Sequence, residues 1–311
     1  MTRRVLTRLF ASLGVVFGAV TLIFLILNWL PGDPAELVAG DTASPETVAQ
    51  LRVQLGMGRP IWEQYQDYIT GLLRGDLGRS FVTREPVLQR LAAQFPATVT
   101  LTLSAGLVAL LLGVGLGVVS ARYHGRWLDQ LIQCVALALV SVPAFWLGLL
   151  AILVFSVQLG WLPVLGNGGF APSIMPIACL GIVQSVPVLR MVRDGILQGL
   201  YEPYVTTLRA KGLGERRVFY VHVLRNALIG AVTLLSLVIG ELLSGAVIME
   251  TLFARQGLGR VTVEAIGQKD LPVVQGAILL ASTTYVIVNF LVDVSYTWID
   301  PRLRTQLQAA R

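Results

Sequence analysis

Long apolar stretches without charged residues alternate with polar segments along the whole chain. A helix needs about 20 apolar residues to cross a bilayer core of about 30 Å. Six stretches meet or approach this length, and they cover residues 9–30, 98–121, 131–158, 173–189, 226–249 and 271–292. Backbone groups in lipid must be satisfied inside the segment, and these stretches lack the alternation of barrel strands. The pattern predicts an all-α fold with six transmembrane helices, in one membrane domain over residues 1–311.

The composition supports this interpretation and excludes several other classes of protein. Hydrophobic residues make up 55% of the chain and charged residues 14%, and the mean hydropathy is +0.71. Soluble domains carry about 25% charged residues. Two cysteines exclude a disulfide scaffold and a cysteine-rich zinc site. The net charge of +6 is spread between the apolar stretches, so we expect no nucleic-acid partner.

The first apolar stretch follows Arg3, Arg4 and Arg8, as it would in a signal peptide. It is about 22 residues long, whereas the apolar part of a signal peptide has about 7–15, and no A-x-A cleavage site follows it. We therefore expect an uncleaved first span.

The distribution of lysine and arginine predicts the orientation of the spans. Residues 1–8, 122–130, 190–225 and 293–311 together carry 15 of the 24 lysines and arginines, so we expect them, and both termini, in the cytoplasm. The long segment 31–97 is then external. Its aromatic residues recur at helical spacing between turns, which predicts a small helical cap, with a packed loop as the alternative.

The segment 190–225 predicts a short helix that lies across the cytoplasmic membrane surface. Glu202-Pro203 is a helix start, Tyr204, Leu208 and Lys211 share one face, and Gly212 is a stop signal. A second helix begins at Glu215. The apolar and basic face fits either lipid headgroups or a groove in a soluble partner, and a solvated charged loop is the alternative.

The residues of this segment resemble a known motif. Residues 204–213 read Tyr-Val-Thr-Thr-Leu-Arg-Ala-Lys-Gly-Leu and residues 222–228 read His-Val-Leu-Arg-Asn-Ala-Leu, which resembles the cytoplasmic EAA loop of ABC importer permeases of the dipeptide, oligopeptide, opine and nickel branch. Further fragments of that branch follow in order: Leu30-Pro31-Gly32-Asp33-Pro34-Ala35, Gly75-Asp76-Leu77-Gly78, Trp161-Leu162-Pro163, Gly257-Leu258-Gly259, Leu271-Pro272-Val273-Val274-Gln275-Gly276 and Asp300-Pro301-Arg302.

The chain also departs from the family pattern at several points. Thr206-Thr207-Leu208 stands in place of Glu-Ala-Ala. Arg255-Gln256 precedes Gly257-Leu258-Gly259, where Trp-Pro or Pro is usual. These departures leave the resemblance intact and the cargo open.

The resemblance implies a non-catalytic, six-span permease subunit in the bacterial cytoplasmic membrane, in contact with membrane lipid. Its partners would be a second homologous permease, two cytoplasmic ABC ATPases and an external substrate-binding protein. ATP and magnesium would bind to the ATPases, with no cofactor on this chain. The cargo would be a peptide, an opine, glutathione or a nickel chelate. Helix 202–213 would be the coupling helix that docks on an ATPase, through Tyr204, Leu208, Arg209, Ala210, Lys211 and Gly212.

Catalytic motifs are missing from the sequence. The chain has two lysines, Lys211 before Gly and Lys269 before Asp, so no P-loop G-x-x-x-x-G-K-[ST] exists. His124 and His222 both lie in predicted cytoplasmic segments, which disfavours an intramembrane Ser-His protease and a His-Cys metal site. An ATP-independent secondary transporter or channel is the alternative function, and a membrane-embedded enzyme is a more distant one.

Three polar residues inside predicted spans are candidates for the translocation pathway. Glu241 is the only charged residue deep in a span, where charges usually face a bundle interior or a water-filled cavity. A hydrogen bond to a neighbouring helix is the alternative for Glu241. Gln184 and Asn289 could also line the pathway, with interhelical packing as their alternative role.

Overall fold

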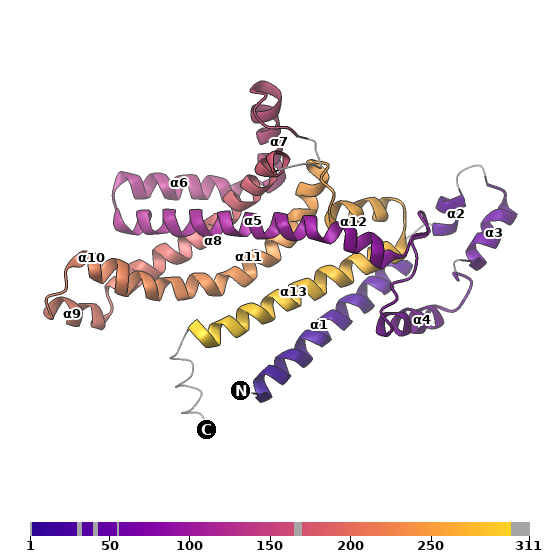
Figure 1. Ribbon diagram of the computed structural model, residues 1–311, viewed down its shortest axis with the longest axis horizontal. Helices are drawn as coiled ribbons and strands as arrows, with labels where there is room; N and C mark the ends of the chain where they lie inside the picture. The colour runs from indigo at the N-terminus through magenta and orange to yellow at the C-terminus, as the bar shows by residue number, and fades with distance from the viewer. Residues whose placement is uncertain (1, 30–32, 40–42, 55, 165–169, 300–311) are drawn as a thin grey trace. The chain divides into compact units, whose positions relative to one another are not determined.

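The computed structural model describes residues 2–29, 33–39, 43–54, 56–164 and 170–299. Over these ranges the chain is helical, and its one β-type pairing is an isolated bridge between Arg79 and Pro86. The expected all-α fold is therefore confirmed for the described residues. The helices are α1 Thr2–Trp29, α2 Pro34–Ala39, α3 Pro45–Gln54, α4 Ile61–Leu73, α5 Val87–Arg122, α6 Trp127–Ser141, α7 Ala144–Ala151, η1 Ile152–Gln158, α8 Ala171–Leu200, α9 Pro203–Ala210, α10 Glu215–Arg217, η2 Val218–Val223, α11 Leu224–Leu252, α12 Leu258–Gly267 and α13 Leu271–Ile299 (Figure 1).

Four of the described helices are long and apolar enough to cross a membrane. They are residues 11–29 of α1, the whole of α5, the whole of α8, and residues 271–291 of α13. A fifth is added if α6 and the α7–η1 segment count as one bent span. Helix α11 covers the predicted span 226–249. A total of six spans remains a prediction.

The predicted span 131–158 is not one straight helix. α6 ends at Ser141, α7 begins at Ala144, and the chain bends by 100° between α6 and the α7–η1 segment (Figure 1). Pro143 explains the break, because it has no backbone N–H to donate and it disfavours helical backbone at the residue before it. Val142 is indeed extended, with φ −106° and ψ 126°.

Helix α8 extends well beyond the predicted span 173–189. It has 30 residues, contains Pro176 and Pro187, and ends at Leu200, so the first part of the predicted loop 190–225 is helical. Its last turns continue to bury an apolar face, with Val192 and Ile196 in the core. This burial stabilises the helix where hydropathy alone predicted its end.

The chain forms two compact units, of which the first comprises residues 1–98 and 256–286. Its core joins the start of α5 to α12 and α13, through Val87, Leu91, Val261, Ala265, Val273 and Val274. Gly276 permits this packing, because a Cβ there would lie 2.7 Å from Cγ1 of Val87. In the predicted external cap, α4 packs on α1, where the Tyr68 ring stacks on Phe24 with a centroid distance of 5.6 Å.

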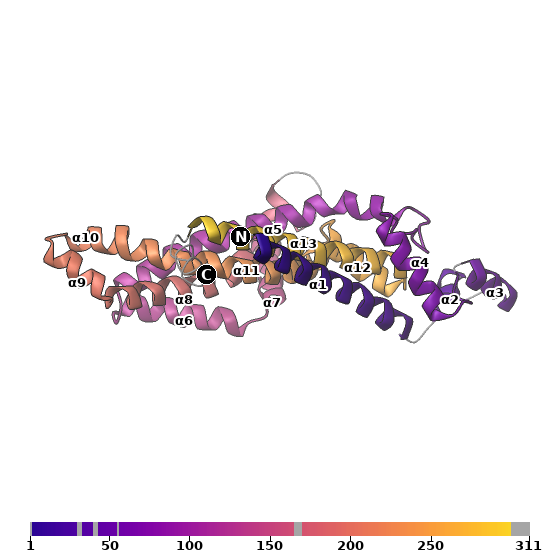
Figure 2. The ribbon, with the colours of Figure 1, turned by 90° about the horizontal axis from the view of Figure 1, so that it is seen from below.

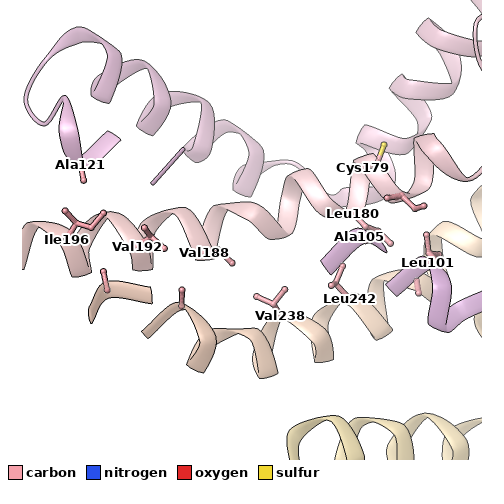
Figure 3. Close-up of a cluster of buried hydrophobic side chains, with 14 of the residues drawn as sticks. Leu101, Ala105, Ala121, Cys179, Leu180, Val188, Val192, Ile196, Val238 and Leu242 are labelled. Carbon is pink, nitrogen blue, oxygen red and sulfur yellow. The ribbon is translucent and has the colours of Figure 1, made fainter. Parts of the chain in front are cut away.

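The second unit comprises residues 99–255 and 287–311. Its core is made by α5, α8 and α11, and Figure 3 shows their apolar side chains directed at one another, among them Leu101, Ala105, Leu180, Val188, Val238 and Leu242. Two glycines of α5 permit a close approach to α8. A Cβ on Gly113 would lie 2.6 Å from Cβ of Val188, and one on Gly117 would lie 2.8 Å from the Leu189 carbonyl oxygen.

Candidate functional site

The inner loop, defined here as residues 201–223 between α8 and α11, contains the predicted coupling helix. Helix α9 spans Pro203–Ala210 and follows an extended Glu202. Gly212 has φ +81°, a left-handed conformation that favours glycine, and its N–H donates to the Arg209 carbonyl at 2.9 Å. Glu202-Pro203 and Gly212 thus stand at the two ends of α9. Figure 2 shows α9 and α10 together at the end of this unit, where α8 ends.

Helix α9 is attached to the core of its unit by one face. Val205 is fully buried, and Tyr204 and Leu208 are half-buried against the same core. The Tyr204 hydroxyl also accepts a hydrogen bond from Nδ2 of Asn226, at 3.2 Å. The opposite side of the helix, with Thr206, Thr207, Arg209 and Ala210, is exposed, as are Lys211 and Gly212. Sequence reasoning missed the anchoring role of Val205, although its i, i+3 spacing to Leu208 places the two residues on one face of the helix.

Arg209, one of the predicted docking residues, pairs with a residue of its own loop. Its Nε and Nη2 donate to the two carboxylate oxygens of Glu215, at 2.7 and 3.1 Å. This hydrogen-bonded guanidinium lowers the pKa of Glu215 below its usual value. Both side chains are exposed. The pair links the end of α9 to the start of α10, and the neighbouring charged residues Lys211 and Arg216 are also exposed.

A buried charge cluster, which the sequence did not reveal, joins three helices of the second unit. Asp129, in the first turn of α6, is buried and accepts from Arg193 of α8, with Nε to Oδ1 and Nη2 to Oδ2 both at 3.0 Å. Ser120 of α5 donates to Oδ1 at 2.5 Å, and the Gly125 N–H donates to Oδ2 at 3.0 Å. Bidentate arginine–carboxylate pairs are strong and directional. This Asp129 cluster therefore fixes α6 against α8.

The Asp129 cluster is close to the inner loop along the chain. Arg193 is seven residues before the end of α8, which corresponds to about 10 Å of helix. His124 lies at the rim of the cluster, with Nδ1 3.2 Å from Oδ2 of Asp129 and 3.0 Å from Nη2 of Arg193. A displacement of α9 would therefore be transmitted to the Asp129 cluster through α8 alone.

The first unit contains a second buried carboxylate, Asp270, between α12 and α13. It accepts hydrogen bonds from the Ser80 hydroxyl and from the Phe81 N–H at 2.9 Å, while Nη1 of Arg90 lies 3.6 Å away. These partners come from positions about 190 residues earlier in the chain. The Asp270 cluster, meaning Asp270, Ser80, Phe81 and Arg90, holds the turn after α4 on the α12–α13 junction.

The three pathway candidates are not joined to one another in the described part of the chain. Gln184 lies on α8, and its Oε1 is buried without a hydrogen-bond partner. Glu241 lies on α11 and is exposed in the single chain, and Asn289 lies on α13 and is half-buried. Their role in the pathway stays a prediction. Within the same ranges no group of three or more His, Cys, Asp or Glu side chains could hold a metal ion.

Comparison with known families covers almost the whole chain. Residues 113–305 match the model of the binding-protein-dependent transport system inner membrane component, and residues 1–102 match the model of the N-terminal part of such membrane components.

Curated relatives match from end to end. A protein of Brucella abortus (strain 2308) named as a peptide transport system permease is 41% identical over 312 residues, with 98% of this chain and 99% of the relative covered. The glutathione transport system permease protein GsiC of Escherichia coli (strain K12) is 39% identical over 304 residues, with 98% and 99% covered.

A solved structure shares the fold. The inward-facing MetNI methionine ABC transporter in its CY5 native crystal form aligns with a TM-score of 0.58 and 18% identity, over 70% of this chain and 99% of that chain. The family models and the curated relatives confirm the family that the EAA-like residues predicted. The chain belongs to the binding-protein-dependent transport system inner membrane components, and it is a multi-pass inner-membrane permease of the ABC importer type.

Proposed function

We propose that this chain is one of two permease subunits that form the pathway of an ATP-driven importer for peptides or glutathione. A second, homologous permease completes the pathway, two cytoplasmic ABC ATPases bind ATP and magnesium, and an external binding protein delivers the solute. Both termini and the inner loop are cytoplasmic in this arrangement. The names of the relatives, a peptide permease and a glutathione permease, support this choice of cargo.

The observation that carries the proposal is the construction of α9. The buried Val205 fixes one side of the helix to the core, while the other side is exposed next to the glycine stop. α9 follows α8 after two residues, and its Tyr204 binds Asn226 near the start of α11. A partner that pushes on the exposed side therefore acts on both long helices. The positions of Ala210 and Lys211 make them the surface that an ATPase would contact.

If α9 docks on an ATPase, the left-handed backbone of Gly212 that ends this helix should be needed to couple ATP hydrolysis to transport. Gly212→Val places a β-branched residue at φ +81°, where the backbone strain is about 1–3 kcal/mol. The space around this glycine is open, with no atom within 4 Å of the place that a Cβ would take, so strain rather than a clash is the cause. We expect normal membrane insertion but clearly reduced ATP-driven uptake and reduced stimulation of the ATPases. The measurement is uptake and ATP hydrolysis of the purified complex in liposomes.

Gly214→Val is the matched control. Gly214 also has open space around it, but its φ of −64° suits any residue, so this variant should behave like the wild type. Equal activity of the Gly212→Val and wild-type complexes would contradict the docking role of α9. Uptake that persists without ATP would instead support the alternative of an ATP-independent transporter.

A further inference from the structure

The end of α11 opposite to the inner loop carries an arginine with unusual partners. Arg255 follows α11 and contacts the other two core helices of its unit. Its Nη1 donates to the hydroxyl of Ser173 in the first turn of α8, and its Nη2 lies 3.4 Å from Oγ1 of Thr100 on α5. The guanidinium is thus held where the ends of α8 and α11 meet the side of α5.

Arg255 combines partial burial with neutral partners, whereas other described arginines without a carboxylate partner, such as Arg79, Arg122 and Arg216, are exposed. Six other arginines in the described ranges pair with carboxylates: Arg52, Arg59, Arg90, Arg193, Arg209 and Arg260. Arg255 forms no such ion pair there, and its Nε is buried without a hydrogen-bond partner. A partly buried guanidinium without a counter-charge is costly, and an anion bound beside its Nη2 would supply that counter-charge.

The guanidinium has one side from which a ligand would approach. Arg255 is half-buried and its Nε is buried, whereas Thr100 beside Nη2 is exposed, so the approach would be along the Nη2 edge. The local field also favours an anion, because Ser173 lies in the first turn of the 30-residue helix α8. An oxygen of the ligand would accept from the Nη2 edge of Arg255, and the Thr100 hydroxyl could donate to the same group.

We propose that Arg255, with Thr100 and Ser173, binds a carboxylate of the transported solute at the outer end of the pathway. This inference rests on the proposed function, because peptides and glutathione carry carboxylates and because a cytoplasmic α9 places Arg255 at the opposite, outer end of α11.

The test compares a peptide with a free C-terminal carboxylate and the same peptide as its amide. ATP-driven uptake is measured in liposomes with the complete complex, for wild type, Arg255→Gln and Arg255→Lys. We expect Arg255→Gln to raise the KM for the free peptide about tenfold and to leave the amide unchanged. Arg255→Lys should be intermediate, because a lysine keeps the charge but not the planar fork. For each peptide, the KM of the variant is divided by the KM of the wild type, so any preference of the binding protein for one of the two peptides cancels.

Arg260→Gln is the matched control, because it removes an arginine that pairs with Glu264 on its own helix and should not separate the two peptides. An equal loss, or no loss, for both peptides in Arg255→Gln would overturn the carboxylate site and leave the proposed function standing. A discrimination that disappears when anionic lipid is omitted would assign the site to a lipid phosphate and also overturn it. A wild-type complex that imports neither peptide with ATP would overturn the proposed function and this site together.

Discussion

The two buried aspartates, Asp129 and Asp270, have different partners that compensate their negative charge. Asp129 joins α6 to α8 and, through Ser120, to α5, and its charge is matched by the bidentate guanidinium of Arg193 at 3.0 Å. Asp270 lies under a turn, and its closest partners are a hydroxyl and a backbone N–H, with Arg90 at 3.6 Å. A helix–helix junction is thus neutralised by a rigid charge pair, whereas a turn supplies its own donors. The contact between α6 and α8 at Asp129, which precedes the inner loop, should therefore be stiffer than the turn held by Asp270.

The largest expected effect is from Asp129→Asn. The substitution removes the charge that compensates Arg193, and loss of one partner of a buried ion pair costs about 3–5 kcal/mol. We expect a lower Tm of the purified complex and fewer solute molecules imported per ATP, because α8 loses its fixed attachment to α6. Thermal unfolding and the uptake-to-hydrolysis ratio measure the two effects. The double variant Asp129→Asn with Arg193→Met should recover much of the stability, and an additive loss would show that the two residues do not interact.

The same substitution at Asp270 should cost less. Asp270→Asn keeps an acceptor for Ser80 or Phe81 but leaves one hydrogen-bonding group poorly matched, at about 1–3 kcal/mol. The uptake-to-hydrolysis ratio should stay near the wild-type value, because this cluster lies in the unit without the inner loop. A destabilisation of Asp270→Asn that exceeds that of Asp129→Asn would reverse the comparison.

The rim of the Asp129 cluster should contribute little. His124 contacts both Asp129 and Arg193, but its side chain is 56% exposed. We expect His124→Gln to change the unfolding free energy by no more than about 0.5 kcal/mol, as for most surface substitutions. A loss comparable to that of Asp129→Asn would show that the histidine belongs to the buried core of the cluster.

The smallest effect is expected at the exposed pair of Arg209 and Glu215. The lowered pKa of Glu215 means that the contribution of this pair is present above the ordinary glutamate pKa of about 4.3 and is lost as the pH falls through the lowered value. Arg209→Gln should therefore leave the Tm at pH 7 unchanged within error, since exposed pairs contribute little. A drop in ATPase stimulation with an unchanged Tm would locate Arg209 at the docking contact.

The sequence predicted the features that depend on neighbouring residues. The apolar stretches marked the membrane-capable helices, and the Glu202-Pro203 start and the Gly212 stop bracketed α9, because capping and φ preferences act within a few residues. Pro143, which lacks a backbone N–H, lies at the break between α6 and α7, where the chain bends by 100°.

Features that depend on distant residues were not predicted. Asp129 and Arg193 are 64 positions apart, and Ser80 and Asp270 are 190 apart, so no local pattern links them. Helix α8 continues 11 residues beyond the predicted span 173–189, because Arg190 and Arg193 interrupt the hydropathy while the buried Val192 and Ile196 continue the helix. Long-range pairing and burial decided these points, and a single sequence does not display them.

Helix α8 gives the molecule a single continuous body of about 45 Å, with Ser173 at one end and the start of the inner loop at the other. A ligand or partner that binds at either end of α8 therefore contacts the same helix. If an ATPase binds at the inner loop and a solute carboxylate binds near Ser173, thermodynamic reciprocity requires each to change the affinity for the other by the same factor. One uninterrupted helix would thus be enough to couple the binding of a solute at one end of α8 to the binding of an ATPase at the other end.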